Sequence, residues 1–172
     1  LPEPTIPCRH TRFIADTAIR IAPSATLFYS EVYMSGRKYF DGGETFQYDI
    51  LSVCSHAERP DGEQLFREKF IIRPGACPPG TLGAMNGYDV FANVIVMTPP
   101  EHADRIYEAT PAFIDRDRRL AAGITRLPND AGLLYKVLGE ETGPVKKLIR
   151  EFCSSVRLEV KGRPLPEEFP WR

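Results

Sequence analysis

Apolar and polar residues alternate along the first half of the chain, which predicts a series of β-strands. From residue 11 to 21 every second side chain is uncharged while arginines and Asp16 fall between them, as in a strand with one face in water. Residues 26–34 are largely apolar on both faces. This second segment therefore predicts a strand that is covered on both sides.

Two further β-like runs, residues 46–56 and 64–73, flank Arg59-Pro60-Asp61-Gly62-Glu63. An Asp-Gly pair supplies the positive φ of a tight turn, and a proline ahead of it fixes the backbone. We expect a hairpin here, within the stretch 36–73, in a layered sheet. The loop that follows, residues 73–88, is rich in glycine and proline and too long for a simple connection, which is typical of a functional or mobile segment.

The second half of the chain changes to a mixed pattern. Residues 90–97 form an apolar strand, and Thr98-Pro99-Pro100-Glu101 resembles a capping box that opens a helix ending near residue 111. Residues 121–127 and 133–138 predict a second hairpin. Residues 144–156 place Val145, Leu148, Ile149, Phe152 and Val156 at helical spacing. This order of strand, helix, two strands and helix is typical of a split βαβ-like unit.

The predicted fold class is therefore mainly β with an α+β C-terminal part: stacked antiparallel or mixed sheets, sandwich-like or β-helical, plus two helices. Its 172 residues suit a single domain, 1–172, with a sheet-rich part at 1–88 and the mixed part at 89–172. The chain begins at Leu1 with three prolines in seven residues. We interpret this segment as an extended connection and expect the chain to be a fragment of a longer protein.

The composition and the motifs of the chain exclude several classes of function. A net charge of −1 makes nucleic acid and anionic membranes poor partners, and no apolar run approaches the roughly 20 residues that span a bilayer. The four cysteines are scattered, which favours free thiols in the cytoplasm. Without a G-x-S-x-G sequence or a phosphate-binding loop, the chain is not expected to be an enzyme.

A metal site is one open alternative. Cys8-Arg9-His10 and Cys54-Ser55-His56 each place a thiol and an imidazole two residues apart, and on a strand such residues share a face. The two pairs together would form a Cys₂His₂ set suited to zinc or nickel. The alternative is a buried cysteine and an incidental surface histidine in each pair.

Three glutamates are the sharper candidates. Glu31 falls between two tyrosines and Glu68 between two phenylalanines on apolar strand faces, where an unpaired carboxylate is costly. Each is expected either to pair with an arginine such as Arg12, Arg37 or Arg67, or to line a wet cavity or partner surface. Glu44, in a glycine-rich corner, has the same two interpretations.

A series of short motifs runs along the whole chain: Leu1-Pro2-Glu3-Pro4-Thr5-Ile6-Pro7 with Arg12-Phe13, Glu31 with Gly36-Arg37, Gly43-Glu44-Thr45-Phe46, Leu65-Phe66-Arg67-Glu68, Leu82-Gly83 with Tyr88-Asp89, Leu127 to Gly139, and Gly162-Arg163-Pro164 with Pro170-Trp171. In this order the motifs resemble those of the urease accessory protein D family, UreD or UreH. Cys8, Thr11 and the tail Phe169-Pro170-Trp171-Arg172 depart from the family pattern. The chain resembles the C-terminal two thirds of such a protein.

The resemblance implies an accessory factor with a mostly β, stacked-sheet fold and two helices. It implies binding to urease apoprotein on one side and to UreF and the GTPase UreG on the other, and help with nickel insertion, the ion passing transiently through the interior. Glu31, Glu68 and Glu44 are then path or interface residues with Arg37 as a pairing partner, since isolated acids supply weak oxygen ligands. Two alternatives remain: a nickel carrier that uses Cys8, His10, Cys54 and His56, and a β-rich interaction module unrelated to nickel.

Overall fold

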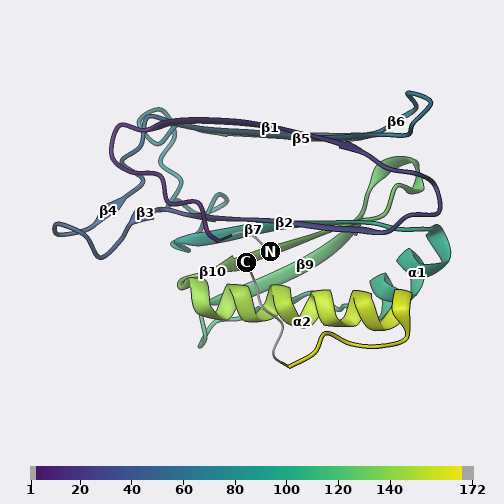
Figure 1. Ribbon diagram of the computed structural model, residues 1–172. Coiled ribbons are helices and arrows are strands. Elements are labelled where there is room, and N and C mark those ends of the chain that lie inside the picture. The colour runs from purple at the N-terminus through teal and green to yellow at the C-terminus, as the bar shows by residue number, and fades with distance from the viewer. Residues whose placement is uncertain (1–2, 168–172) are drawn as a thin grey trace.

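The computed structural model describes residues 3–167, which fold into three stacked layers: a sheet, a second sheet and a helical layer (Figure 1). A three-stranded sheet has the order β1-β5-β6, a five-stranded sheet has the order β2-β7-β10-β9-β8, and β3 and β4 form a small ladder. The strands are β1 Arg12–Arg20, β2 Leu27–Met34, β3 Gly36–Arg37, β4 Glu44–Thr45, β5 Ile50–Glu58, β6 Gln64–Ile72, β7 Val90–Met97, β8 Phe113–Asp115, β9 Leu120–Arg126 and β10 Leu133–Gly139; the helices are α1 Pro100–Glu108 and α2 Thr142–Lys161. Leu1, Pro2 and the tail motif at residues 169–172 lie outside the described residues.

Both predicted hairpins are confirmed. β5 pairs with β6 and β9 pairs with β10, each antiparallel. β5 begins at Ile50 and not at Phe46, because Phe46 has a φ of 54° and cannot continue a strand. β1 pairs with β5 in parallel, an arrangement that no local pattern predicted.

The five-stranded sheet joins the two halves of the chain. β2 comes from the first half and pairs with β7 of the second, antiparallel over its whole length. β10 is antiparallel to both β7 and β9, so β7 and β9 run in the same direction with β10 between them and α1 connecting them. This is the split βαβ-like arrangement expected from the element order. The short edge strand β8 was not predicted.

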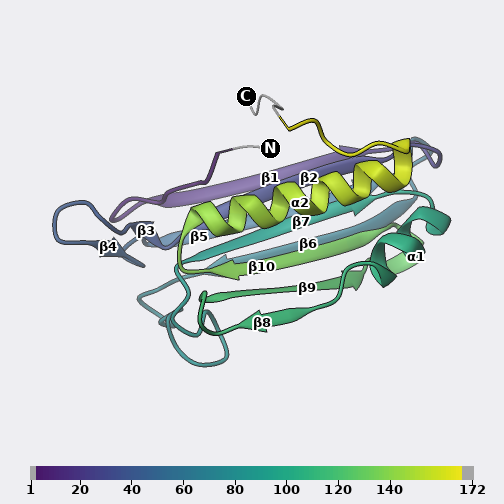
Figure 2. The same cartoon turned by 90° about the horizontal axis from the view of Figure 1, so that it is seen from below.

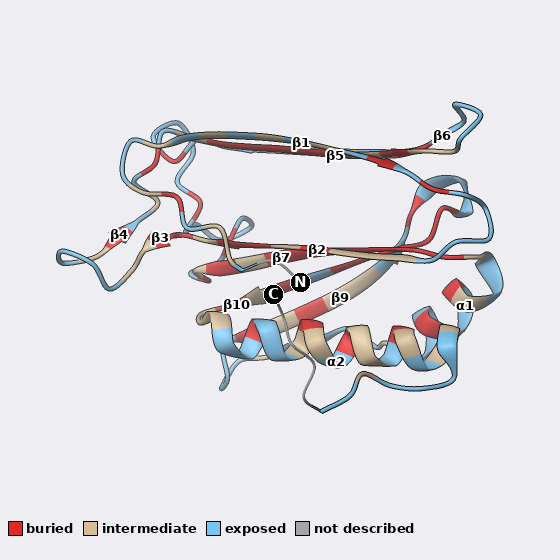
Figure 3. Cartoon of the chain, viewed as in Figure 1, coloured by how far each residue is buried: buried red, intermediate tan, exposed pale blue. Residues whose placement is uncertain are grey.

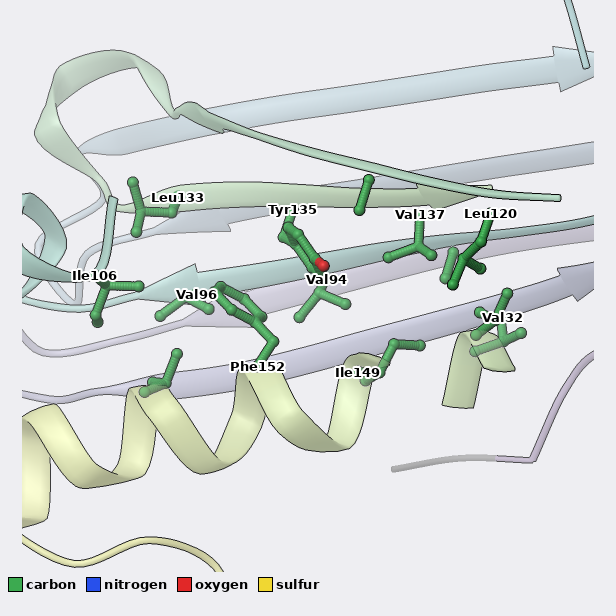
Figure 4. Packing of buried hydrophobic residues seen from close by; sticks show 14 of the residues in the cluster. Val32, Val94, Val96, Ile106, Leu120, Leu133, Tyr135, Val137, Ile149 and Phe152 are labelled. Atoms are coloured by element: carbon green, nitrogen blue, oxygen red, sulfur yellow. The ribbon is translucent and has the colours of Figure 1, made fainter. Parts of the chain in front are cut away.

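The helical layer covers one face of the five-stranded sheet (Figure 2). α2 buries four of the five residues expected from helical spacing, Val145, Ile149, Phe152 and Val156, against valines of β2, β7 and β10 (Figure 4). The fifth, Leu148, is partly buried against the same cluster. The Phe152 ring lies 4.3 Å from that of Tyr135. The other face of this sheet meets the three-stranded sheet, so side chains of β7 pack into apolar clusters on both faces and the strand is buried along almost its whole length (Figure 3).

The predicted capping box of α1 is wrong. The helix begins at Pro100 with Pro99 at the N-cap, and no side chain caps it. The hydroxyl of Thr98 instead lies 2.8 Å from that of Thr26, before β2, and the residue is buried. Thr98 therefore links the segment after β7 to the segment before β2. In the part of the chain that the structure describes, no helix is long and apolar enough to cross a membrane.

Candidate functional site

A band of polar side chains crosses the interior between the two sheets. In the three-stranded sheet, strand pairing places Thr17 opposite Ser55 and Ser55 opposite Glu68. In the five-stranded sheet it places Glu31 opposite Asn93 and Asn93 opposite Lys136. We call these six residues the inter-sheet band: Thr17, Glu31, Ser55, Glu68, Asn93 and Lys136.

The band separates two apolar clusters. Side chains two residues apart on a strand share a face. Except at Lys136, the neighbours of the band at that spacing belong to one cluster on one side and to the other cluster on the other side. Glu68, for example, lies between Phe66 of the first cluster and Phe70 of the second. Asn93 lies between Ile95 and Phe91 in the same way. The polar residues therefore form a continuous row and are not scattered defects in one core.

Hydrogen bonds join the two sheets at both ends of the band. At one end the ammonium of Lys136 donates to Oε1 of Glu68 at 2.6 Å. At the other end the hydroxyl of Thr17 lies 3.2 Å from that of Tyr29, and Tyr29 donates to Oε1 of Glu31 at 2.7 Å. Burial, together with the carboxylate of Glu31, raises the pKa of Tyr29 to about 12 although the Thr17 contact lowers it. Tyr29 therefore stays a donor at neutral pH.

The middle of the band is buried and its end at Lys136 is open to water. Ser55 and Asn93 are 4% and 5% exposed, whereas the Lys136 side chain is 54% exposed. The hydroxyl of Ser55 has no hydrogen-bond partner among the described residues. Carboxylate, hydroxyl and amide oxygens are the ligand types that hold divalent cations weakly. The band thus offers a succession of oxygen donors across the interior.

Among residues 3–167, neither Glu31 nor Glu68 pairs with an arginine, so that expectation is wrong for both. Glu68 pairs with Lys136, and Glu31 has no basic partner within residues 3–167. Alternation explains this result for Arg67, because it is one residue from Glu68 and points to the opposite, exposed face of β6. The wet-cavity or partner-surface interpretation of the two glutamates stays open.

Glu44 lies outside the band and is clamped by Arg37. The guanidinium donates to both carboxylate oxygens, at 2.8 and 2.7 Å, across the β3–β4 ladder. Glu44 is 4% exposed, and its pKa is lowered by the Arg37 hydrogen bonds and by the backbone N–H of Arg9. This pair holds the projecting β3–β4 segment closed, and Arg37 is the pairing partner expected for an acid, although for Glu44 alone.

The Glu44 clamp predicts a pH-dependent effect on stability. Because the folded protein lowers the pKa of Glu44, the carboxylate stabilises the fold above about pH 4.3, the value of an unperturbed glutamate, and loses this effect as the pH falls through the lowered pKa. Glu44→Gln should therefore be less stable than the parent at pH 7, and the difference should shrink at acid pH. Urea unfolding from pH 7 to 3 measures it, with Glu63→Gln at an exposed turn as control. A difference that does not vary with pH would contradict this explanation.

The predicted Cys₂His₂ set does not form. Cys8 and His10 precede β1, where the imidazole of His10 lies 3.4 Å from Asp49. Cys54 and His56 share one face of β5, as expected from their spacing, but they lie opposite Asp16 and Ala18 in the middle of β1. The parallel β1–β5 register therefore keeps the two pairs apart. Within residues 3–167, the group of metal-ligating side chains is instead Asp16, Cys54 and His56.

Four members of the band were not predicted as site residues from the sequence, namely Thr17, Ser55, Asn93 and Lys136. The available signal was the one that identified Glu31 and Glu68, a polar side chain on an apolar strand face. Asn93 within the apolar run 90–97 carries this signal clearly. Their alignment into one row depends on strand register and was not visible in the sequence.

The sequence of this chain is similar to a known protein family and to several curated proteins. The family model described as "UreD urease accessory protein" matches residues 1–172. The chain is 50% identical over 171 residues to urease accessory protein UreD 2 of Brucella suis biovar 1 (strain 1330), covering 99% of this chain and 57% of that protein. It is 46% identical over 178 residues to urease accessory protein UreD of Yersinia enterocolitica, covering all of this chain and 55% of that protein.

The chain thus spans a little over half the length of these curated relatives. These relatives are named urease accessory proteins. The stacked sheets with two helices match the fold expected from the resemblance. The family match over the entire sequence shows that this chain belongs to the UreD family of urease accessory proteins.

Proposed function

We propose that this chain acts in urease maturation as a cytoplasmic scaffold. It binds urease apoprotein on one side and UreF, and through UreF the GTPase UreG, on the other. Nickel is a transient cargo that moves along the inter-sheet band toward the urease active site. Family membership supports the role in maturation, and the four free cysteines agree with a reducing compartment.

The observation that carries the nickel path is the band itself. Burying polar groups between two sheets costs free energy unless they are satisfied, yet Ser55 and Asn93 are buried here, and the partly buried Thr17, Glu31 and Glu68 lie in the same row between two apolar clusters. A row of oxygen donors lets a dication exchange one weak ligand set for the next, whereas a thiolate and imidazole site would retain it. This argues for a path made of Glu31, Asn93, Ser55 and Glu68.

The two ends of the band differ in charge. At the Glu68 end the ammonium of Lys136 occupies the carboxylate, and its exposed side chain can turn toward solvent. An arriving dication would displace it and take its place. At the Glu31 end the carboxylate has only hydroxyl donors, so it is free to bind a cation without displacing another. The band therefore attracts a cation more strongly at Glu31.

The scaffold assignment predicts a stable complex. A protein of the relatives' full length that contains this chain should co-purify with urease apoprotein and UreF when the three are expressed together. Size-exclusion chromatography with light scattering gives the stoichiometry of the complex. If the well-folded protein bound neither partner, the scaffold role would be wrong and the chain would share only the family's fold.

A further inference from the structure

The outer face of the three-stranded sheet, away from the band, brings together three different metal-ligating groups. Asp16 lies directly opposite Cys54 in the parallel β1–β5 pairing, and His56 follows two residues later on the same face of β5. One ligand atom from each residue lies within 4.8 Å of the other two. This face is the outer one because Val53 and Ala57, which alternate with these residues, belong to the inter-sheet clusters.

The distances suit one bound ion. In a tetrahedral zinc site, ligand bonds of about 2.0 Å to oxygen and nitrogen place these two atoms about 3.3 Å apart. Nδ1 of His56 already lies 3.2 Å from Oδ1 of Asp16. A sulfur ligand at about 2.3 Å would lie about 3.5 Å from each of them. Because the ligand atoms lie within 4.8 Å of one another, the thiol of Cys54 would have to approach by up to about 1.3 Å.

The three groups have no competing partners. Nδ1 of His56 is buried and makes no hydrogen bond within residues 3–167, because its contact with Asp16 lacks hydrogen-bond geometry. Cys54 is a free, buried thiol. In the described part of the chain Asp16 forms an ion pair with neither lysine nor arginine. A buried imidazole nitrogen with no partner is costly, and a metal ion would satisfy it.

We propose that Asp16, Cys54 and His56 bind a divalent transition-metal ion of borderline softness, with zinc as the representative ion. One sulfur, one nitrogen and one oxygen ligand leave a fourth position for water or an external ligand. The ion would join the edge strand β1 to β5. The site does not rest on the function proposed above, since it uses other residues on the opposite face of the sheet.

Metal titration of the reduced, metal-free protein tests the site. Cobalt serves as a spectroscopic probe, and zinc affinity is measured by competition with a chromophoric chelator. The parent should bind one equivalent of each ion with a thiolate-to-cobalt charge-transfer band. Cys54→Ser should remove this band. Asp16→Asn and His56→Gln should each weaken zinc binding at least about tenfold, because even groups that only orient a metal ligand contribute that much.

The double variant Cys8→Ser with His10→Gln is the matched control, since it removes the other thiol–imidazole pair and should keep full binding. Asp16 is 59% exposed, so Asp16→Asn should retain the fold even if the Cys54 variant does not. Absence of the charge-transfer band in the parent would overturn the proposal. So would equal zinc affinity in the parent and Asp16→Asn, or loss of the site in the control.

Discussion

Glu31→Gln is expected to lower nickel-dependent activation of urease by about tenfold or more, the range seen when a group that supports a metal site is removed. Glutamine can still accept the hydrogen bond from Tyr29, which is 2.7 Å long in the parent, so the packing should be retained. The substitution removes only the negative charge. The measurement is urease activity after reconstitution at limiting nickel, with the full-length protein, UreF and UreG.

Two variants at the Glu68 end of the band test the same path independently. Glu68→Ala should also lower activation without unfolding the protein, because it removes an oxygen donor from the row. Lys136→Gln should keep or increase activation, because it removes the cation that occupies Glu68. These two residues form one ion pair, so a purely structural role would predict the same sign for both variants.

Glu58→Gln is the matched control for the loss of a strand carboxylate. Glu58 pairs with Arg20 on β1, at a distance of 2.6 Å, outside the band. It should support activation at the parent level. Activation by Glu31→Gln equal to that of the parent at limiting nickel would contradict the proposed path. In urea unfolding, the free energy of unfolding should change by less than about 1 kcal/mol for both Glu31→Gln and Glu58→Gln.

Gly132→Ala is expected to destabilise the fold strongly. Gly132 precedes β10 with a φ of +134°, a conformation that other residues rarely adopt. A Cβ built there would lie 2.0 Å from the carbonyl oxygen of Val96 and 2.9 Å from the Cα of Met97. Both are backbone atoms of β7 and cannot move without disturbing the central pairing. We expect a loss of at least about 3 kcal/mol in the free energy of unfolding.

Gly143→Ala provides the control, because this glycine lies in the first turn of α2 with no atom near the added Cβ. Alanine should leave stability unchanged or raise it by up to about 1 kcal/mol, since glycine is the poorer helix former. Equilibrium unfolding in urea with far-ultraviolet circular dichroism compares the two variants. Equal midpoints would show that β7 and β10 can separate locally to admit the methyl group.

Local patterns predicted most of the secondary structure correctly because each depends on residues close in sequence. Alternation in residues 11–21 identified β1, turn chemistry at Asp61-Gly62 identified the β5–β6 hairpin, and helical spacing identified the buried face of α2. Two predictions failed for other reasons. The hydroxyl of Thr98, expected at a helix cap, forms a contact with Thr26, which is 72 residues distant in the sequence, and the chain bends at Phe46.

In the candidate sites, too, some residues could be recognised from the local sequence, whereas their partners could not. Glu31 and Glu68 could be recognised because a carboxylate on an apolar strand face is unusual wherever it occurs. Their partners could not, since Glu68 meets Lys136 across 68 positions of the chain and between two sheets. Likewise, Cys54 and His56 share a face by spacing alone, whereas Asp16 joins them through a parallel strand pair. The Cys₂His₂ prediction failed on this register.

The sequence by itself thus determined the long strands, the two hairpins, the two helices and the family, because periodicity, turn residues and motif order are properties of neighbouring residues. Only the tertiary structure decided which polar residues meet. One residue of slip in a strand pairing would turn every side chain to the other face, and the pairing of β1 with β5 and of β2 with β7 joins segments far apart in the chain. The inter-sheet band depends on the registers of both pairings, and the Asp16–Cys54–His56 group depends on the register of β1 with β5.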